Sequence, residues 1–296
     1  MAADLHAHST RSDGLLSPRQ LVEAAHRAGL RALALTDHDA VSGVEEASLA
    51  ATELGLELIA GVELSIRDVD PATGSVTDHH LLGLFVDPTA PALLAFLERL
   101  QEQRRDVATK TLDRLAQLGL PVDPARVAAF AAGATVTRPH IARAMVEAGH
   151  VPDERSAFAR YLGNGKPAAV ERATAPPAET IAIVRAAGGV ASLAHPVFPS
   201  DGDTDLRLRA LPGMLDRLRA AGLQAVEARY PDATPAISDQ LARWAAERDL
   251  LLTSGSDYHG PNKAPFVPLG HTSAAAAELA ALRVLVEPLP AKLDRA

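Results

Sequence analysis

The chain has 296 residues and a mass of 31.0 kDa, enough for one large domain or two smaller ones. Hydrophobic residues make up 47% and charged residues 22%, a globular composition that excludes a disordered or fibrous chain. The formal net charge of −8 argues against a protein that coats long duplex nucleic acid or an anionic membrane. The absence of cysteine excludes disulfides, thiolate metal sites and cysteine nucleophiles.

The beginning of the chain does not have the pattern of a signal peptide. Asp4, His6 and Arg11 interrupt its apolar residues, whereas a signal peptide needs an uninterrupted apolar run. The sequence also has no run of about 20 apolar residues, the length that a bilayer span requires. We therefore expect a soluble cytoplasmic protein.

Short apolar runs alternate with amphipathic segments along most of the chain. Helices are predicted over 18–28 and 178–187, and each is followed by a glycine that can cap it, Gly29 and Gly188. The apolar runs predict buried strands at the beginning of the chain and over 32–35, 56–66, 81–86, 190–194 and 250–253. About seven alternating strand and helix units predict a parallel α/β barrel.

Residues 98–170 interrupt this alternation because they show helical patterns and almost no strand pattern. A long helix is predicted over 97–118 and another over 138–148. Gly163, Gly165 and Pro167 mark a loop over 161–170 that returns to the barrel. We predict a small helical domain at 98–170, inserted between barrel segments 1–97 and 171–296.

Histidines and carboxylates gather at the ends of the predicted strands. His6 and His8 are two residues apart, so in a strand both imidazoles lie on one face. Asp13 follows in the next loop, and His79 and His80 come at the beginning of the fourth predicted strand. Later strand ends carry similar side chains: Asp37, His38, Asp39, Glu63, His195, Asp257 and His259. In an α/β barrel such strand ends converge on one face, where barrel enzymes place their chemistry. The alternative is that each histidine is separately structural or exposed, which requires many coincidences.

This set holds more imidazoles and carboxylates than one metal ion can bind. Two or three divalent ions that share a bridging carboxylate would use all of them. Clusters of this kind typically hydrolyse phosphate esters or amides.

Several of these motifs together resemble the signature of the PHP (polymerase and histidinol phosphatase) superfamily. The motifs are His6-x-His8, Thr36-Asp37-His38-Asp39, Gly61-Val62-Glu63, Ala194-His195-Pro196 and Ser256-Asp257-x-His259. Residues 137–143 and 161–167 resemble the branch of ribonuclease AM and 3′,5′-nucleoside bisphosphate phosphatase. The resemblance implies an α/β fold, a distorted (β/α)7 TIM-like barrel with a small inserted helical domain.

The resemblance also implies three metal positions. The first takes His6, His8, Glu63 and Asp257; the second shares Glu63 and adds His80 and His195; the third takes Asp13, His38 and His259. His80 is chosen over His79 because the branch's His-x-Leu-Gly pattern fits residues 80–83. An aspartate at position 13 favours manganese, with iron and zinc as alternatives.

The same resemblance implies a phosphoesterase that acts on small nucleotides or short oligonucleotides. Catalytic roles are predicted for Asp13, His195, His259 and His140, and substrate binding for Arg138, His140 and Lys166. The predicted reaction converts adenosine 3′,5′-bisphosphate to AMP, with 5′→3′ trimming of short 5′-phosphorylated oligoribonucleotides as a further activity. A histidinol-phosphatase type of metabolite phosphatase and a non-catalytic PHP scaffold module are the alternatives. The sequence leaves the oligomeric state open.

Overall fold

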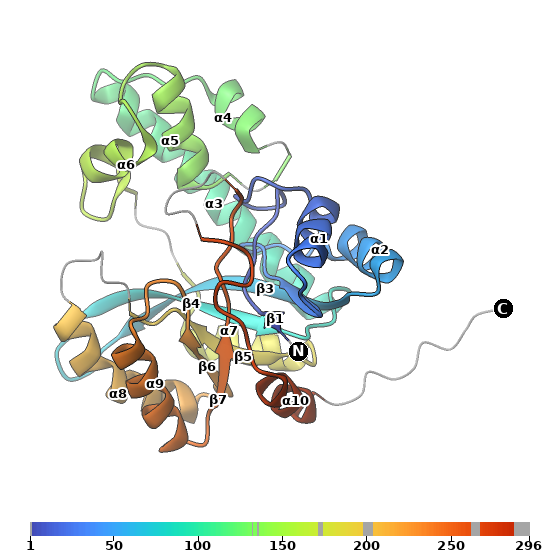
Figure 1. Ribbon diagram of the computed structural model, residues 1–296. Coiled ribbons are helices and arrows are strands. Elements are labelled where there is room, and N and C mark those ends of the chain that lie inside the picture. Colours follow the sequence, from blue (N-terminus) through green and yellow to red (C-terminus); the bar gives the residue numbers. More distant parts are fainter. Residues whose placement is uncertain are drawn as a thin grey trace.

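Seven strands form one sheet in the order β1 to β7, which curls into a nearly closed barrel in this computed structural model (Figure 1). The structure describes residues 2–131, 133–134, 136–170, 174–197, 204–261 and 267–286. The strands are β1 (Ala3–Asp4), β2 (Ala32–Leu35), β3 (Glu57–Val69), β4 (Val76–Leu84), β5 (Val190–Ala194), β6 (Ala225–Arg229) and β7 (Leu251–Ser254).

Helices cover the outside of the barrel and form a separate group above it (Figure 1). Those around the barrel are α1 (Pro18–Arg27), α2 (Val44–Leu54), α7 (Pro177–Ala186), α8 (Thr204–Ala220) and α9 (Pro235–Ala246). Helix α10 (Ala276–Leu285) instead packs Leu279 and Leu282 against the apolar cluster inside the barrel. Helix α1 begins as its sequence predicts, because Ser17 and Gln20 form a capping box ahead of Pro18.

The direction of β4 differs from the predicted all-parallel arrangement. Strands β1, β2 and β3 are parallel, as are β5, β6 and β7, but β4 is antiparallel to both β3 and β5. The first half of β4 therefore lies beside the last half of β3 and the end of β5. His80, for example, pairs with Ser65 and with Ala194.

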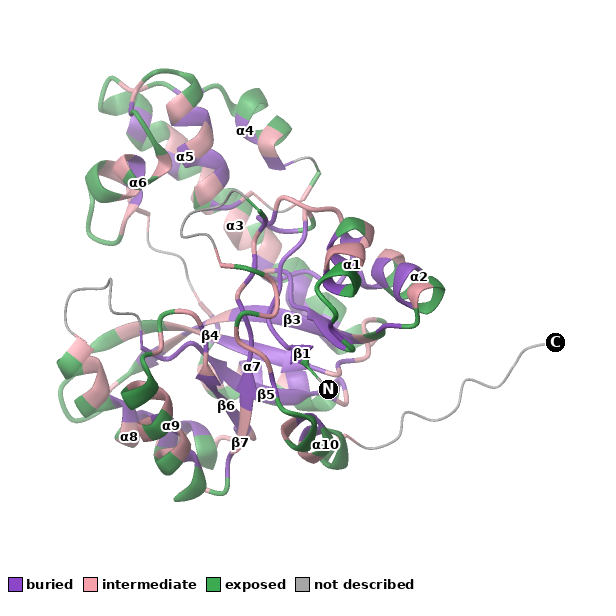
Figure 2. Ribbon diagram, viewed as in Figure 1, coloured by how far each residue is buried: buried purple, intermediate pink, exposed green. Residues whose placement is uncertain are grey.

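Alternation along the strands explains how the barrel is packed. In β2, Ala32 and Ala34 belong to the apolar cluster inside the barrel, whereas Leu33 and Leu35 pack outward among the helices. Small side chains inside and larger ones outside suit a narrow barrel. The strands are accordingly the buried centre of the molecule (Figure 2). The barrel closes where the backbone of Leu5 donates to Ser254 O at 3.1 Å.

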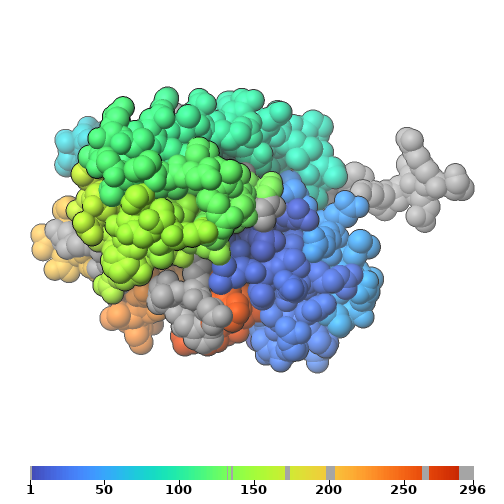
Figure 3. Space-filling model, turned by 90° about the horizontal axis from the view of Figure 1, so that it is seen from above, coloured from blue at the N-terminus to red at the C-terminus, as the bar shows by residue number. Residues whose placement is uncertain are grey.

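The group of helices above the barrel contains α3 (Pro91–Gln117), α4 (Pro124–Ala131), α5 (Arg138–Glu147), α6 (Glu154–Ala157) and η1 (Phe158–Leu162), a short π-helical turn. A separate apolar cluster, which includes Leu115, Ile141 and Met145, holds this group together. Helix α3 begins six residues before its predicted start, at Pro91. Seen from above, the group spreads over one face of the molecule beside the N-terminal residues (Figure 3). The predicted division at residues 98 and 170 stays a prediction.

Across the described residues, no helix is both long enough and apolar enough to cross a membrane.

Candidate metal centre

The two histidines that follow β1 are the centre of the cluster. Both are fully buried, and their Nε2 atoms face the same two carboxylates. His6 Nε2 lies 3.4 Å from Glu63 Oε2 and 3.3 Å from Asp257 Oδ1. His8 Nε2 lies 3.1 Å and 3.2 Å from the same two oxygens. Strands β1 and β3 and the segment after β7 therefore bring four ligand atoms to one point.

These separations fit a shared cation. Two ligands that each lie about 2.0–2.2 Å from one ion are themselves roughly 3 to 3.5 Å apart. His6 Nε2, His8 Nε2, Glu63 Oε2 and Asp257 Oδ1 are buried and have no hydrogen-bond partner among the described residues. Because buried polar atoms normally have partners, these four atoms suit a divalent metal ion.

Glu63 extends the cluster because its two oxygens face different imidazoles. Oε1 lies 2.8 Å from His80 Nδ1 and 3.0 Å from His195 Nε2. Oε2, which already faces His6 and His8, also lies 3.1 Å from His38 Nδ1. This side chain can therefore bridge two cations, as a carboxylate with two oxygens often does.

A third group of ligand atoms lies beside the first. His8, Asp13, His38 and His259 each offer one atom, and these atoms all lie within 4.8 Å of one another. His259 Nε2 is 3.3 Å from Asp13 Oδ1, and the rings of His8 and His259 stack with centroids 4.2 Å apart.

The structure thus brings all the predicted metal ligands into one cluster, in groupings close to those expected. The first group is the predicted one, with His6, His8, Glu63 and Asp257. Two details differ from the predicted groupings. The second group contains His38 in addition to Glu63 and His80, and His195 contacts the same carboxylate. The third group contains His8 in addition to the three predicted residues. The roles of these residues as ligands stay a prediction.

Hydrogen bonds at Nδ1 orient three of the imidazoles. His6 Nδ1 faces the carboxylate of Glu227, and His259 Nδ1 lies 2.7 Å from the carbonyl oxygen of Asp257. His8 Nδ1 is 3.4 Å from Ser12 Oγ, whose hydroxyl donates to Asp37 at 2.6 Å. Since all three partners are acceptors, Nδ1 carries a proton and Nε2 is the ring nitrogen that can bind a cation, or a second proton in its place.

Electrostatics within the cluster keep the carboxylates ionised. Burial alone raises the pKa of Glu63, but the imidazoles of His38, His80 and His6 outweigh it and hold the pKa well below its usual value. Burial lowers the pKa of His8, yet Asp257 and Glu63 raise it to about 10. In His38, burial dominates and lowers the pKa to about 3. The carboxylates thus attract positive charge, which protons or divalent cations can supply.

The backbone is unusual where it carries this site. His195 and Asp257 have positive φ values of 23° and 49°, and Asp39 has φ 50°. Positive φ is uncommon for residues other than glycine and costs free energy. These three residues follow β2, β5 and β7, where the cluster lies, while Phe85 and Asp249 have positive φ values elsewhere.

The predicted substrate-binding residues lie in the group of helices above the barrel. His140 is buried in a capping box, where its Nδ1 accepts from the backbone of Thr137 at 3.1 Å. Arg138 is exposed, and its Nη1 donates to Leu162 O at 3.3 Å and to Asn164 Oδ1 at 2.9 Å. Lys166 is exposed in the loop that follows. Their contact with substrate stays a prediction, as does the catalytic role of His140.

Two buried carboxylates near the cluster were not predicted. Glu227 on β6 contacts His6 and the backbone of His195, and Asp4 accepts from the backbones of Ser256 at 2.9 Å and Gly270 at 2.8 Å. Strand β6 was not predicted either. The sequence pattern that could have indicated both β6 and Glu227 is a single carboxylate within a short apolar run, residues 225–228.

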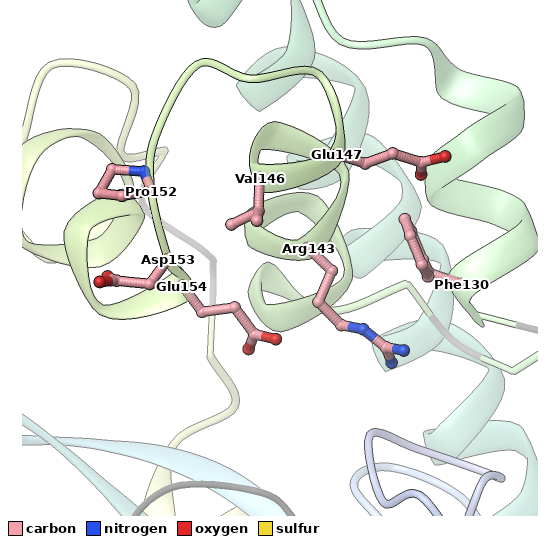
Figure 4. A pocket seen from close by; sticks show the side chains of 7 residues that line it. All are labelled: Phe130, Arg143, Val146, Glu147, Pro152, Asp153 and Glu154. Carbon is pink, nitrogen blue, oxygen red and sulfur yellow. The ribbon is translucent and has the colours of Figure 1, made fainter.

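A surface cavity of about 440 Å³ lies among the upper helices (Figure 4). It contains none of the residues of the metal cluster. Its lining residues are Phe130, Arg143, Val146, Glu147, Pro152, Asp153 and Glu154.

Comparison with known proteins agrees with this geometry. Residues 4–118 match the PHP domain family. The chain is 38% identical to a 5′-3′ exoribonuclease from Haemophilus influenzae, over 87% of this chain and 90% of that protein. It is 34% identical to a 3′,5′-nucleoside bisphosphate phosphatase from Chromobacterium violaceum, over 91% and 90% of the two chains. A structure assigned as a metal-dependent phosphoesterase from Bifidobacterium adolescentis superposes with a TM-score of 0.85 at 30% identity, over 97% of both chains.

The cluster, the barrel and these relatives lead to one assignment. The predicted fold class is confirmed, as is the predicted membership of the branch to which these relatives belong. The chain belongs to the PHP family of metal-dependent phosphoesterases.

Proposed function

We propose that this enzyme hydrolyses phosphate esters of nucleotides, with nucleoside 3′,5′-bisphosphates as its principal substrates. The observation that carries the proposal is the shared carboxylate of Glu63, which faces several imidazoles with both of its oxygens. The relatives named for nucleotide and ribonucleotide substrates cover most of this chain. Their names support the substrate class.

We assign one cation position to His6, His8, Glu63 and Asp257, where the ligand atoms converge most closely. A second position uses Glu63, His80 and His195, and a third uses Asp13, His38 and His259. The donors are imidazole nitrogens, which suit zinc and iron, and carboxylate oxygens, which suit manganese. The carboxylate of Asp13 in the third position is the reason for choosing manganese. When bound, such cations withdraw charge from phosphate and make water a nucleophile near neutral pH.

The exposure of the cluster indicates the side from which a substrate reaches it. The side chains of His80, Asp257 and His259 are 34%, 28% and 16% exposed, whereas those of His6 and His8 are fully buried. A phosphate ester therefore enters beside the exposed three. Asp13 and His259 are next to each other on that side, so a cation held by them would offset the negative charge of the leaving alkoxide.

Arg138 and Lys166 supply charge for a second phosphate on the same nucleotide. Desolvation of its guanidinium by the surrounding chain, together with the charge of Arg104, lowers the pKa of Arg138, although the residue as a whole is exposed. Arginine nevertheless stays protonated at physiological pH. The guanidinium of Arg138 suits a phosphate, because guanidinium donates paired hydrogen bonds to phosphate oxygens. This would make the upper helices the part of the enzyme that selects bisphosphates.

A phosphate-release assay on metal-stripped protein reloaded with manganese tests the proposal. We expect release from adenosine 3′,5′-bisphosphate and far slower release from histidinol phosphate. Comparable or faster release from histidinol phosphate would favour a metabolite phosphatase instead. No release from any nucleotide would reject the proposed substrate class.

A second activity is favoured by the similarity to the Haemophilus influenzae exoribonuclease. Aromatic residues make up only 3% of the chain and the net charge is −8, so little surface suits stacking or tracking of long RNA. We expect 5′-phosphorylated oligoribonucleotides of a few residues to be trimmed from the 5′ end. Rates that keep rising with length beyond about ten nucleotides would contradict this expectation.

A further inference from the structure

Glu227 lies behind the metal cluster and touches two of its histidines. Its Oε1 and Oε2 are both 3.3 Å from His6 Nδ1, and Oε2 accepts from the backbone N–H of His195 at 2.8 Å. The side chain is fully buried on β6, between β5, which ends just before His195, and β7, which ends at Ser254. The carboxylate of Glu227 thus contacts both His6, assigned to the first cation position, and His195, assigned to the second.

The surrounding backbone leaves room for this contact. A Cβ atom at Gly255 would lie 2.3 Å from His6 Cβ, too close for a real side chain, and 3.0 Å from Glu227 Oε1, a tight contact. Glycine at 255 therefore lets His6 and Glu227 approach each other. His195, which Glu227 holds by its backbone, has the positive φ of 23°, and a hydrogen bond at its N–H helps to keep that conformation.

We propose that Glu227 is a positioning residue that fixes the tautomer of His6 and the backbone of His195 together. This inference rests on the proposed metal site. Both groups that face Glu227 are donors when His6 carries its proton on Nδ1. A side chain with two acceptor oxygens and no N–H of its own presents only acceptors to these two donors. It therefore leaves the lone pair on His6 Nε2 for a cation. A carboxylate at Nδ1 also makes the imidazole a stronger ligand.

Glutamine at 227 separates this role from simple packing, because it has nearly the same shape but only one acceptor. Its oxygen can bond the N–H of His195, and its NH2 group then faces His6 Nδ1. His6 can accept that hydrogen bond only if its proton moves to Nε2, which removes the lone pair from the cluster. Loss of metal affinity is therefore expected without loss of the fold.

The test measures Mn²⁺ binding to metal-free protein by calorimetry for wild type, Glu227→Gln and Glu247→Gln. We expect Glu227→Gln to weaken one Mn²⁺ site by about 10- to 100-fold. Glu247, an exposed carboxylate on the outer side of the barrel, makes the matched control and should leave binding unchanged. Wild-type affinity in folded Glu227→Gln protein would overturn the inference.

A measurement on the unaltered chain keeps the test valid even if the glutamine variant fails to fold. In zinc-loaded, ¹⁵N-histidine-labelled protein, we expect a hydrogen-bonded proton on His6 Nδ1 and zinc on Nε2, with His6 assigned through His6→Gln. Zinc bound through Nδ1 would overturn the inference. The outcome is independent of the substrate, since absence of nucleotide hydrolysis would reject the proposed function and leave these binding results in place.

Discussion

At the scale of single residues, the cluster depends most on Glu63. Its two oxygens face five imidazoles at 2.8 to 3.4 Å: those of His6, His8, His38, His80 and His195. Glu63→Gln removes the negative charge that these groups share and puts an NH2 donor in place of one oxygen. We expect bound manganese to fall below one ion per chain and phosphate release to drop by more than about 100-fold. Metal analysis after dialysis and the phosphate assay measure both effects.

Glu57 on the same strand provides the control for Glu63→Gln. It is exposed and pairs with Arg283, and exposed ion pairs contribute little to stability. Glu57→Gln should therefore keep both metal and activity. Full metal content in Glu63→Gln protein would refute the assignment of Glu63 as the shared ligand.

Arg138 tests whether the upper helices recognise a second phosphate. Arg138→Ala should raise KM for adenosine 3′,5′-bisphosphate by about 10- to 100-fold, because a charge-assisted hydrogen bond is worth roughly 1.5–3 kcal/mol. Metal content should not change. Arg126→Ala is the comparison, since Arg126 is also an exposed arginine of these helices but pairs with Glu147. Steady-state kinetics that match wild type would remove Arg138 from the substrate site.

The sequence predicted which residues meet in the cluster, but not which groups orient them. Histidine is a rare residue, so His6-x-His8 and His38 are easily recognised at strand ends. The geometry of a barrel then predicts that these strand ends lie together on one face. Glu227 and Asp4 are single carboxylates whose partners come from distant parts of the chain. Spacing along the sequence carries no information about such contacts.

At the scale of elements, the direction of β4 was the main error. An apolar run predicts a buried strand, and the burial pattern of a strand is the same whichever way it runs. Pro71 and Gly74 lie in the short connection from β3, which is long enough only for a hairpin and thus for antiparallel pairing. The reversal matters for the site because it places His80, in the first half of β4, at the edge where the parallel strands end.

The junction of β7 with the beginning of the chain yields a further prediction. Gly255→Ala places a methyl group 2.3 Å from His6 Cβ and 2.7 Å from His6 N, so the strand that carries His6 must shift. We expect the free energy of unfolding to fall by about 1–3 kcal/mol and the affinity for manganese to fall with it. Denaturant titration and calorimetry measure the two quantities.

Gly213 in α8 is a suitable control for Gly255→Ala. A Cβ atom there meets nothing closer than 3.6 Å, and alanine is favoured over glycine inside a helix by up to about 1 kcal/mol. Gly213→Ala should leave stability unchanged or slightly higher, with normal metal binding. Equal behaviour of the two variants would show that the Gly255 contact does not constrain His6.

At the scale of the whole molecule, much of the net charge of −8 lies where it attracts cations. Glu63, Asp257 and Asp13 face the cluster, and Glu227 and Asp37 lie directly behind it. Divalent cations bound there would make the site locally positive in an acidic protein. An overall negative charge is therefore compatible with a phosphate substrate, and steering of the substrate depends on the metal.

Manganese should for the same reason stabilise the entire fold. Strands β3 and β4 and the segments after β1, β2, β5 and β7 each contribute to the cluster, and the unfolded chain cannot bring these groups together. A cation that binds only the folded state adds about 2.7 kcal/mol at 100 times its Kd, so the Tm of metal-free protein should rise steadily with added Mn²⁺. Differential scanning calorimetry measures the rise, which Glu57→Gln should retain and Glu63→Gln should lose. A Tm that does not change at manganese concentrations sufficient for activity would mean that the cluster is not where the ions bind.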